Sequence, residues 1–415
     1  MNRSFAPNII NINNIHTGFP DSANNVFRIN SNEGVFKLDI IYPNGGYAML
    51  QNKFQGIMAM DLLLSGTDKL TAQKISESLD ALGAYVYKSC DYYASSLSLY
   101  GLIDNFDKIL KIVKDCIEHC NFPHEEIDVY KNKRSKEHQI NLEKTGYLAN
   151  RQINWMLFGN KHPYGQAYEK ALYDAIDQSA LKAFVSNQLN HVLYVYTGPE
   201  SFAIETALSD NHFPINPLAE PQTEEALPMP QSHEEWIHKT GSTQNSLRFG
   251  KQLPGRTHPD YYALTLFNLV LGGFFGSRLM KNIREDKGLT YGIHSSITPF
   301  KTYSIFKISS ECNNSLTDVV KTEILNEIKA LQKELIGEEE LNTAKNYFKG
   351  ALLRNFDGAF NIADRFKASI ESGASKSYYE DLFKQIDSIP AEMVKTIANN
   401  YFDTESLNYC VAGEK

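Results

Sequence analysis

The sequence has 415 residues, of which 42% are hydrophobic and 22% are charged, and its formal net charge is −8. This composition is typical of a globular protein that is large enough for two or three separate cores. The acidic balance argues against nucleic acid as a partner, because no basic run offers contacts to phosphates. The sequence also shows no run of about 18 apolar residues and no apolar leader, which favours a cytoplasmic location without membrane contact.

Alternation of apolar and polar side chains predicts strands, and a repeat of three to four residues predicts helices. By these patterns the strands fall at 35–42, 93–100, 297–300 and 303–311, and the helices at 71–83, 104–118 and 316–335. Strand pairs followed by runs of helices favour an α+β fold, in which helices pack on antiparallel sheets. Cys116 and Cys120 lie on one apolar face of a predicted helix, so we interpret them as core residues and not as metal ligands.

The order of motifs repeats once along the chain, which predicts two homologous domains. Four matched pairs are separated by between 206 and 215 residues: Tyr85 and Tyr291, Glu125 and Glu339, Asp177 and Asp387, and Gly198 and Gly413. A proline-rich segment without hydrophobic periodicity separates the two copies and predicts an extended linker. The predicted boundaries are 1–212 for the first domain, 213–232 for the linker and 233–415 for the second domain.

The segment 271–295 is the most informative part of the sequence. A glycine pair at 272–273 is expected to open an amphipathic helix that ends at Gly288, and a strand is expected to start at Tyr291. Arg284 then lies in the last turns of the helix, so that its side chain can converge with that of Tyr291. An arginine and a phenol that converge can bind a carbonyl or carboxylate group, but they do not form a reaction centre.

These motifs resemble the pitrilysin/insulinase-type metallopeptidases, and among them the bacterial half-length members related to mitochondrial processing peptidase. The resemblance covers nearly the whole chain and is strongest in RTHPDYYALTLFNLVLGGFFGSRLMKNIREDKGLTYGI, residues 256–293. It is supported by FGNKHPYG at 158–165, and by the turn of Gly66 and Thr67 that precedes ISESLDALGA. The resemblance implies two homologous α+β domains, each an antiparallel sheet packed with helices. It also implies a structural role for His162, in a turn.

Catalytic members of this family bind zinc through an H-x-x-E-H motif on a helix, where two histidines hold the metal and the glutamate is the general base. Counted back from the glycine–threonine turn, these three positions are Ile57, Met60 and Asp61. No histidine occurs in residues 17–118, and Glu137, near the place of the more distant ligand, cannot hold a catalytic zinc alone. The resemblance therefore implies no catalytic residue, and no metal or other cofactor, in this chain.

In related enzymes, an arginine and a tyrosine at this place in the second domain bind the substrate backbone across the cavity from the zinc. By this resemblance Arg284 and Tyr291 are the substrate-binding residues, and the chain is expected to be the non-catalytic subunit of a heterodimer. A homologous partner would carry the zinc and cut peptides or unfolded segments, and this chain alone would be inactive. Two alternatives stay open: a catalytically silent scaffold or peptide-binding protein of the same fold, and self-association into a homodimer.

Overall fold

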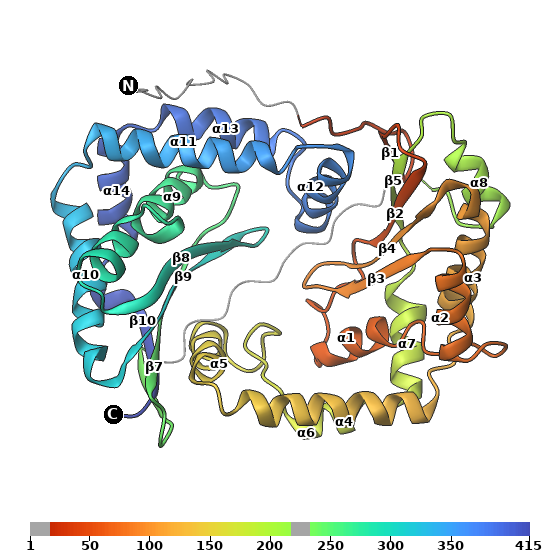
Figure 1. Ribbon diagram of the computed structural model, residues 1–415, viewed down its shortest axis with the longest axis horizontal. Coiled ribbons are helices and arrows are strands. Elements are labelled where there is room, and N and C mark those ends of the chain that lie inside the picture. The colour runs from red at the N-terminus through yellow and green to blue at the C-terminus, as the bar shows by residue number, and fades with distance from the viewer. Residues whose placement is uncertain (1–16, 217–232) are drawn as a thin grey trace, which may run out of the picture.

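Two five-stranded sheets occupy the two halves of the molecule (Figure 1). The computed structural model describes residues 17–216 and 233–415, so the linker predicted at 213–232 lies outside the described residues except for 213–216. The first sheet has the order β1 (Val26–Asn30), β5 (Leu193–Gly198), β2 (Val35–Tyr42), β4 (Ser95–Leu102) and β3 (Tyr85–Cys90). The second has the order β6 (Glu234–His238), β10 (Asn408–Gly413), β7 (Gln244–Pro254), β9 (Tyr303–Asn313) and β8 (Thr290–Pro299).

The second sheet repeats the strand order of the first, so the repeat seen in the sequence is also a repeat in space. In both sheets the first two strands of the order pair in parallel, and the other neighbours are antiparallel. The α+β class is thereby confirmed, whereas the expectation of wholly antiparallel sheets is corrected at this one edge. Parallel pairing requires a long crossover, and most of each half lies between the two paired strands.

Each sheet shares a core with helices of its own half. The helices in the first half are α1 (Lys53–Asp61), α2 (Ala72–Ala81), α3 (Phe106–His119), α4 (His124–Asn141), α6 (Lys170–Asp174), α7 (Gln178–Gln188) and α8 (Ile204–Asp210). Those in the second half are α9 (Tyr261–Asn268), α10 (Thr317–Lys333), α11 (Glu338–Arg354), α13 (Tyr378–Ser388) and α14 (Ala391–Tyr401). The predicted core positions of Cys116 and Cys120 are confirmed, because both thiols are buried. Within the two described ranges, no helix combines the length and apolarity that a membrane crossing requires.

One helix of each half packs on the sheet of the other half. α5 (Thr145–Phe158) packs on β7 and β10, and α12 (Ala359–Ser372) packs on β5, β1 and β2. The two helices hold the same place in the repeat, since both ends are offset by 214 residues, and Figure 1 shows them between the sheets. Ile153 of α5 shares a core with Ile305, and Phe366 of α12 shares another with Phe27. Each sheet therefore buries one face against the other half of the chain.

An aromatic cluster completes the junction between the halves. Phe300, in the turn between β8 and β9, packs edge-on against Tyr92 at a centroid distance of 5.3 Å. His162 stacks on Phe158 at 4.6 Å, and its Nε2 lies 3.0 Å from the Tyr92 hydroxyl. The predicted turn role of His162 is confirmed, because its carbonyl accepts a hydrogen bond from the amide of Gly165. Burial lowers the pKa of His162 to about 4, so the ring is neutral and serves packing.

Candidate functional site

The helix at the expected zinc position is α1, and it is a packing helix. Asn52 caps its first turn through a hydrogen bond from the amide of Phe54 to the side-chain oxygen. Ile57 packs half-buried on the first core, and Met60 is 1% exposed. Two of the three positions thus carry apolar side chains, neither of which is an imidazole or a carboxylate. In the described part of the chain, no cluster of three histidine, cysteine or carboxylate side chains could hold one.

The third position, Asp61, belongs to an ion-pair network with α4. Its Oδ2 accepts hydrogen bonds from the Tyr130 hydroxyl at 2.7 Å and from Nη2 of Arg134 at 2.8 Å. Nη1 of Arg134 donates to Glu137 at 3.0 Å, so one guanidinium bridges both carboxylates. Burial lowers the pKa of Arg134, but Tyr130, Asp61 and Glu137 outweigh it and shift this pKa upward. The residues present do not fit zinc, because a permanent cation already pairs with both of the remaining carboxylates.

Arg284 and Tyr291 lie next to each other at the edge of the second sheet. Arg284 is in the last part of a π-helical segment, Met280–Asp286, and Gly288 has a φ of +61° that reverses the chain into β8. Tyr291 is the extra residue of a β-bulge, since Thr290 pairs with Cys312 and Gly292 with Glu311. The bulge turns Tyr291 out of the sheet, and its side chain is 88% exposed.

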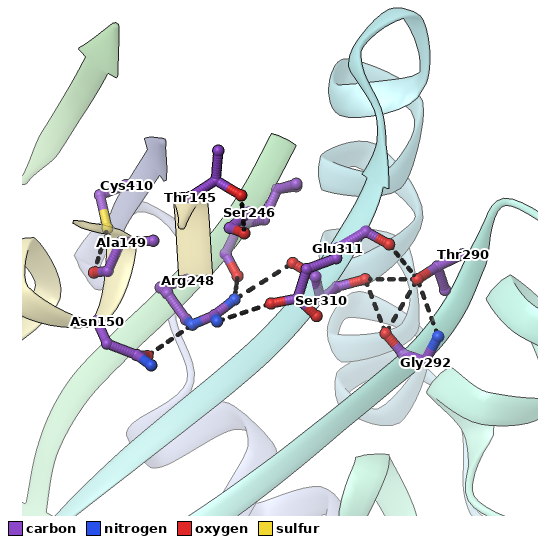
Figure 2. A network of polar contacts seen from close by, with 11 residues as sticks. Thr145, Ala149, Asn150, Ser246, Arg248, Thr290, Gly292, Ser310, Glu311 and Cys410 are labelled. Carbon is purple, nitrogen blue, oxygen red and sulfur yellow. Dashed lines mark hydrogen bonds and ion pairs between the residues drawn. The ribbon is translucent and has the colours of Figure 1, made fainter. Parts of the chain in front are cut away.

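Polar contacts of Thr290 hold this bulge in place (Figure 2). Its hydroxyl oxygen lies 2.5 Å from the carbonyl oxygen of Glu311 and accepts a hydrogen bond from the amide of Gly292 at 3.1 Å. A cavity of about 430 Å³ adjoins the bulge and is lined by Tyr291, Thr290 and Glu311, among others. The exposed phenol thus stands on a rigid backbone beside an open cavity.

The two predicted residues meet through the main chain and not through their side-chain ends. Nε of Arg284 donates to the carbonyl oxygen of Tyr291 at 3.0 Å, and the guanidinium lies 4.9 Å from the ring centre of Phe275. Nη1 and Nη2 of Arg284 contact no partner among the described residues, so both can donate to a ligand. The pair therefore offers a fixed guanidinium and an exposed phenol on adjoining elements.

The glycine pair at 272–273 has a different role from the expected one. It ends the π-helical turn Leu269–Gly273 and does not open the next helix. A Cβ on Gly272 would meet the Ser295 side chain at 2.7 Å and its amide nitrogen at 2.8 Å. Gly272 is thus required because β8 passes directly against this turn, a tertiary contact without a local sequence signal.

Comparison with known proteins agrees with this geometry. The profile of the peptidase M16 inactive domain matches residues 176–348. A crystal structure of a peptidase M16 inactive domain from Pseudomonas fluorescens superposes with a TM-score of 0.82, covering 94% of this chain and 96% of that one at 23% identity. The chain is thus similar to M16 peptidases, in sequence over residues 176–348 and in fold over most of its length. A Helicobacter pylori protease has the same fold at a TM-score of 0.80 and 17% identity, over 95% of this chain and 98% of its own.

A relative of similar length is the uncharacterized zinc protease YmxG of Bacillus subtilis. It is 22% identical over 356 residues, which cover 82% of this chain and 84% of YmxG. The resemblance to pitrilysin/insulinase-type (M16) peptidases is therefore confirmed. Ile57, Met60 and Asp61 stand at the positions counted for the two histidines and the glutamate, so the H-x-x-E-H motif is missing there, and the matching profile is that of an inactive domain. The sequence did not indicate Arg134, whose part in this site depends on tertiary contacts.

Proposed function

We propose that this chain is the non-catalytic subunit of a zinc peptidase, and that Arg284 and Tyr291 contact the peptide that a homologous, zinc-bearing partner cuts. One observation carries the proposal: half-buried Arg284 and exposed Tyr291 lie together with donors available for a ligand, whereas Asp61, counted as one position of the zinc motif, is bound by the guanidinium of Arg134. A chain that has the arginine–tyrosine pair but lacks the catalytic ligands can contribute binding energy to peptide cleavage only when another chain supplies the metal. The proposal includes a cytoplasmic location for both chains.

The geometry of the pair suits a peptide carbonyl. The two nitrogens of Arg284 that make no hydrogen bond to a described residue can donate to one oxygen, and the exposed Tyr291 hydroxyl is a further donor on the adjoining strand. The bond from Nε to the Tyr291 carbonyl couples the guanidinium to the backbone that carries the phenol. Donors that are held before the substrate arrives stabilise developing negative charge without a reorganisation cost at the moment of reaction.

A reconstituted pair of chains tests the proposal. The full chain is co-expressed with a homologous chain that carries H-x-x-E-H, and the turnover of an unstructured peptide is measured. We expect the complex to be active, and we expect Arg284→Ala combined with Tyr291→Phe to lower kcat/KM by about 100-fold with assembly intact. Lys281→Ala is the matched control, because Lys281 is an exposed cation one turn earlier on the same segment.

Two results would contradict the proposal. Stoichiometric zinc in the isolated chain, removed by a chelator together with peptidase activity, would show that this chain is itself the enzyme. Unchanged turnover in the Arg284 and Tyr291 variant would instead favour the silent scaffold, because the pair would then have no part in substrate binding.

A further inference from the structure

A cavity of about 330 Å³ lies beside the Arg134 bridge. Its walls come from the start of α1, the end of α4, the first turns of α5 and the loop over residues 164–168. Arg134 and Glu137 form part of the wall, so the cavity adjoins the ion-pair network that includes Asp61. Neither Arg284 nor Tyr291 lines it.

The cavity is cationic, although the chain carries a net charge of −8. Lys53, Arg134 and Arg151 line it, and Glu137, already paired with Arg134, is the one carboxylate in its wall. The ammonium of Lys53 donates to the carbonyl oxygens of Pro163 at 2.7 Å and of Gln166 at 2.6 Å, and no carboxylate among the described residues pairs with it. Two positive charges of the wall are therefore not neutralised by the protein.

Arg151 has the strongest unmet capacity to bind an anion. It is half-buried, and its five N–H donors contact no partner among the described residues. His138 lines the same cavity, and burial and then the charge of Arg151 lower its pKa. A planar guanidinium without a partner matches the two oxygens of a carboxylate.

Two asparagines of α5 add further donors. Nε of Arg248 donates to Oδ1 of Asn150 at 2.7 Å, as Figure 2 shows, and Nζ of Lys307 donates to Oδ1 of Asn154. Cations can only donate, so both amide oxygens must face the sheet. The NH₂ groups of Asn150 and Asn154, which contact no other described residue, remain as donors for a ligand in the cavity that these residues line.

We infer that this cavity binds a carboxylate of the peptide, with Arg151 as its main ligand and Asn150 and Asn154 as neighbouring donors. The inference rests on the proposed function, since it takes the ligand to be a peptide. Both the C-terminal carboxylate and an aspartate or glutamate side chain present the required two oxygens. The site would give this subunit a preference for acidic peptides or for peptide ends.

Binding of four matched fluorescent peptides to the full chain tests the inference. The peptides share one sequence and differ in a free or amidated C-terminus and in an internal glutamate or glutamine. Fluorescence anisotropy at low salt gives the dissociation constant of each. We expect carboxylate peptides to bind better than the amidated glutamine peptide, and the two single-carboxylate peptides show which source the cavity prefers.

Variants at Arg151 localise the effect. Arg151→Gln should weaken binding of the preferred carboxylate peptide by about 10- to 100-fold and leave the neutral peptide unchanged. Arg151→Lys should recover part of the loss, because it restores the charge without the planar pair of donors. Lys136→Gln is the control, since Lys136 is an exposed cation of α4 outside the cavity and its loss changes the net charge equally.

Each result of these binding measurements supports or contradicts the carboxylate site. Equal binding of all four peptides, or equal effects of Arg151→Gln and Lys136→Gln, would overturn the carboxylate site and leave the proposed function standing. Failure of every peptide to bind would overturn the carboxylate site, and the turnover of the reconstituted pair would then decide the proposed function separately. Unchanged thermal unfolding of Arg151→Gln, expected because this side chain contacts no other described residue, shows that a loss of binding is local.

Discussion

Replacement of Arg248 by methionine tests whether a buried guanidinium holds α5 on the second sheet. Arg248 is 4% exposed on β7 and uses all three nitrogens (Figure 2). Nε donates to Asn150 of α5 at 2.7 Å, and Nη2 donates to Glu311 at 2.7 Å. Nη1 donates to the carbonyl oxygens of Leu247 at 2.8 Å and Ser310 at 3.3 Å. The side chain thus connects a helix of the first half to two strands of the second.

The cost of the substitution follows from these contacts. Methionine keeps most of the aliphatic stem, so it leaves little cavity. The bond to Asn150 has a charged donor and is worth about 1.5–3 kcal/mol. The Glu311 side chain is 45% exposed and becomes hydrated in the variant, so loss of its ion pair with Arg248 adds less than about 1 kcal/mol. We expect Arg248→Met to lower the free energy of unfolding by about 2–4 kcal/mol.

Urea unfolding, followed by far-UV circular dichroism and by the fluorescence of Trp155 and Trp236, measures this loss. The two signals should change together, because the exchange of α5 and α12 makes each sheet depend on the other half. Arg284→Met is the matched control, and its one backbone hydrogen bond is at the surface, so the expected change is under about 1 kcal/mol.

A double-mutant cycle with Asn150→Ala isolates the contact between the halves and should give a coupling free energy of about 1–2 kcal/mol. A loss below about 1 kcal/mol in Arg248→Met, or additive effects in the cycle, would refute the reasoning.

Two further predictions concern the first sheet and helices that pack with it, α12 and α1. Burial raises the pKa of Glu371 to about 7 from 4.5, so the wild type loses stability as pH rises between these values. We expect Glu371→Gln to be more stable than the wild type at pH 8 by about 1–3 kcal/mol, and to lose this advantage near pH 4.5. Urea unfolding at several pH values measures the difference, and equal pH profiles of the two proteins would contradict the prediction. The substitutions Ile57→His, Met60→Glu and Asp61→His restore the zinc motif. We expect this triple variant to bind no stoichiometric zinc until Arg134→Ala also removes the guanidinium. Metal analysis measures the zinc content, and one zinc per chain in the triple variant without Arg134→Ala would disprove the role given to Arg134.

Much of the fold was readable from the sequence because its signals are local. Helices α2, α3 and α10 and strands β2, β4 and β9 follow from the spacing of apolar residues, which burial on one face dictates. The motifs recur in the same order along the chain, so their nearly constant spacing of 206 to 215 residues indicated that the two sheets have matching strand orders. The parallel pairing of β1 with β5 did not, since strand partners far apart in sequence leave no local trace.

The candidate site divides in the same way. The sequence by itself determined that the chain cannot form the family's zinc site, because coordination needs particular side chains and these are missing at Ile57, Met60 and Asp61. Only the tertiary structure decided which group pairs with Asp61, since Arg134 donates to it from 73 residues away along the chain. Such contacts depend on how helices pack, and packing is set by the whole chain and not by any segment of it.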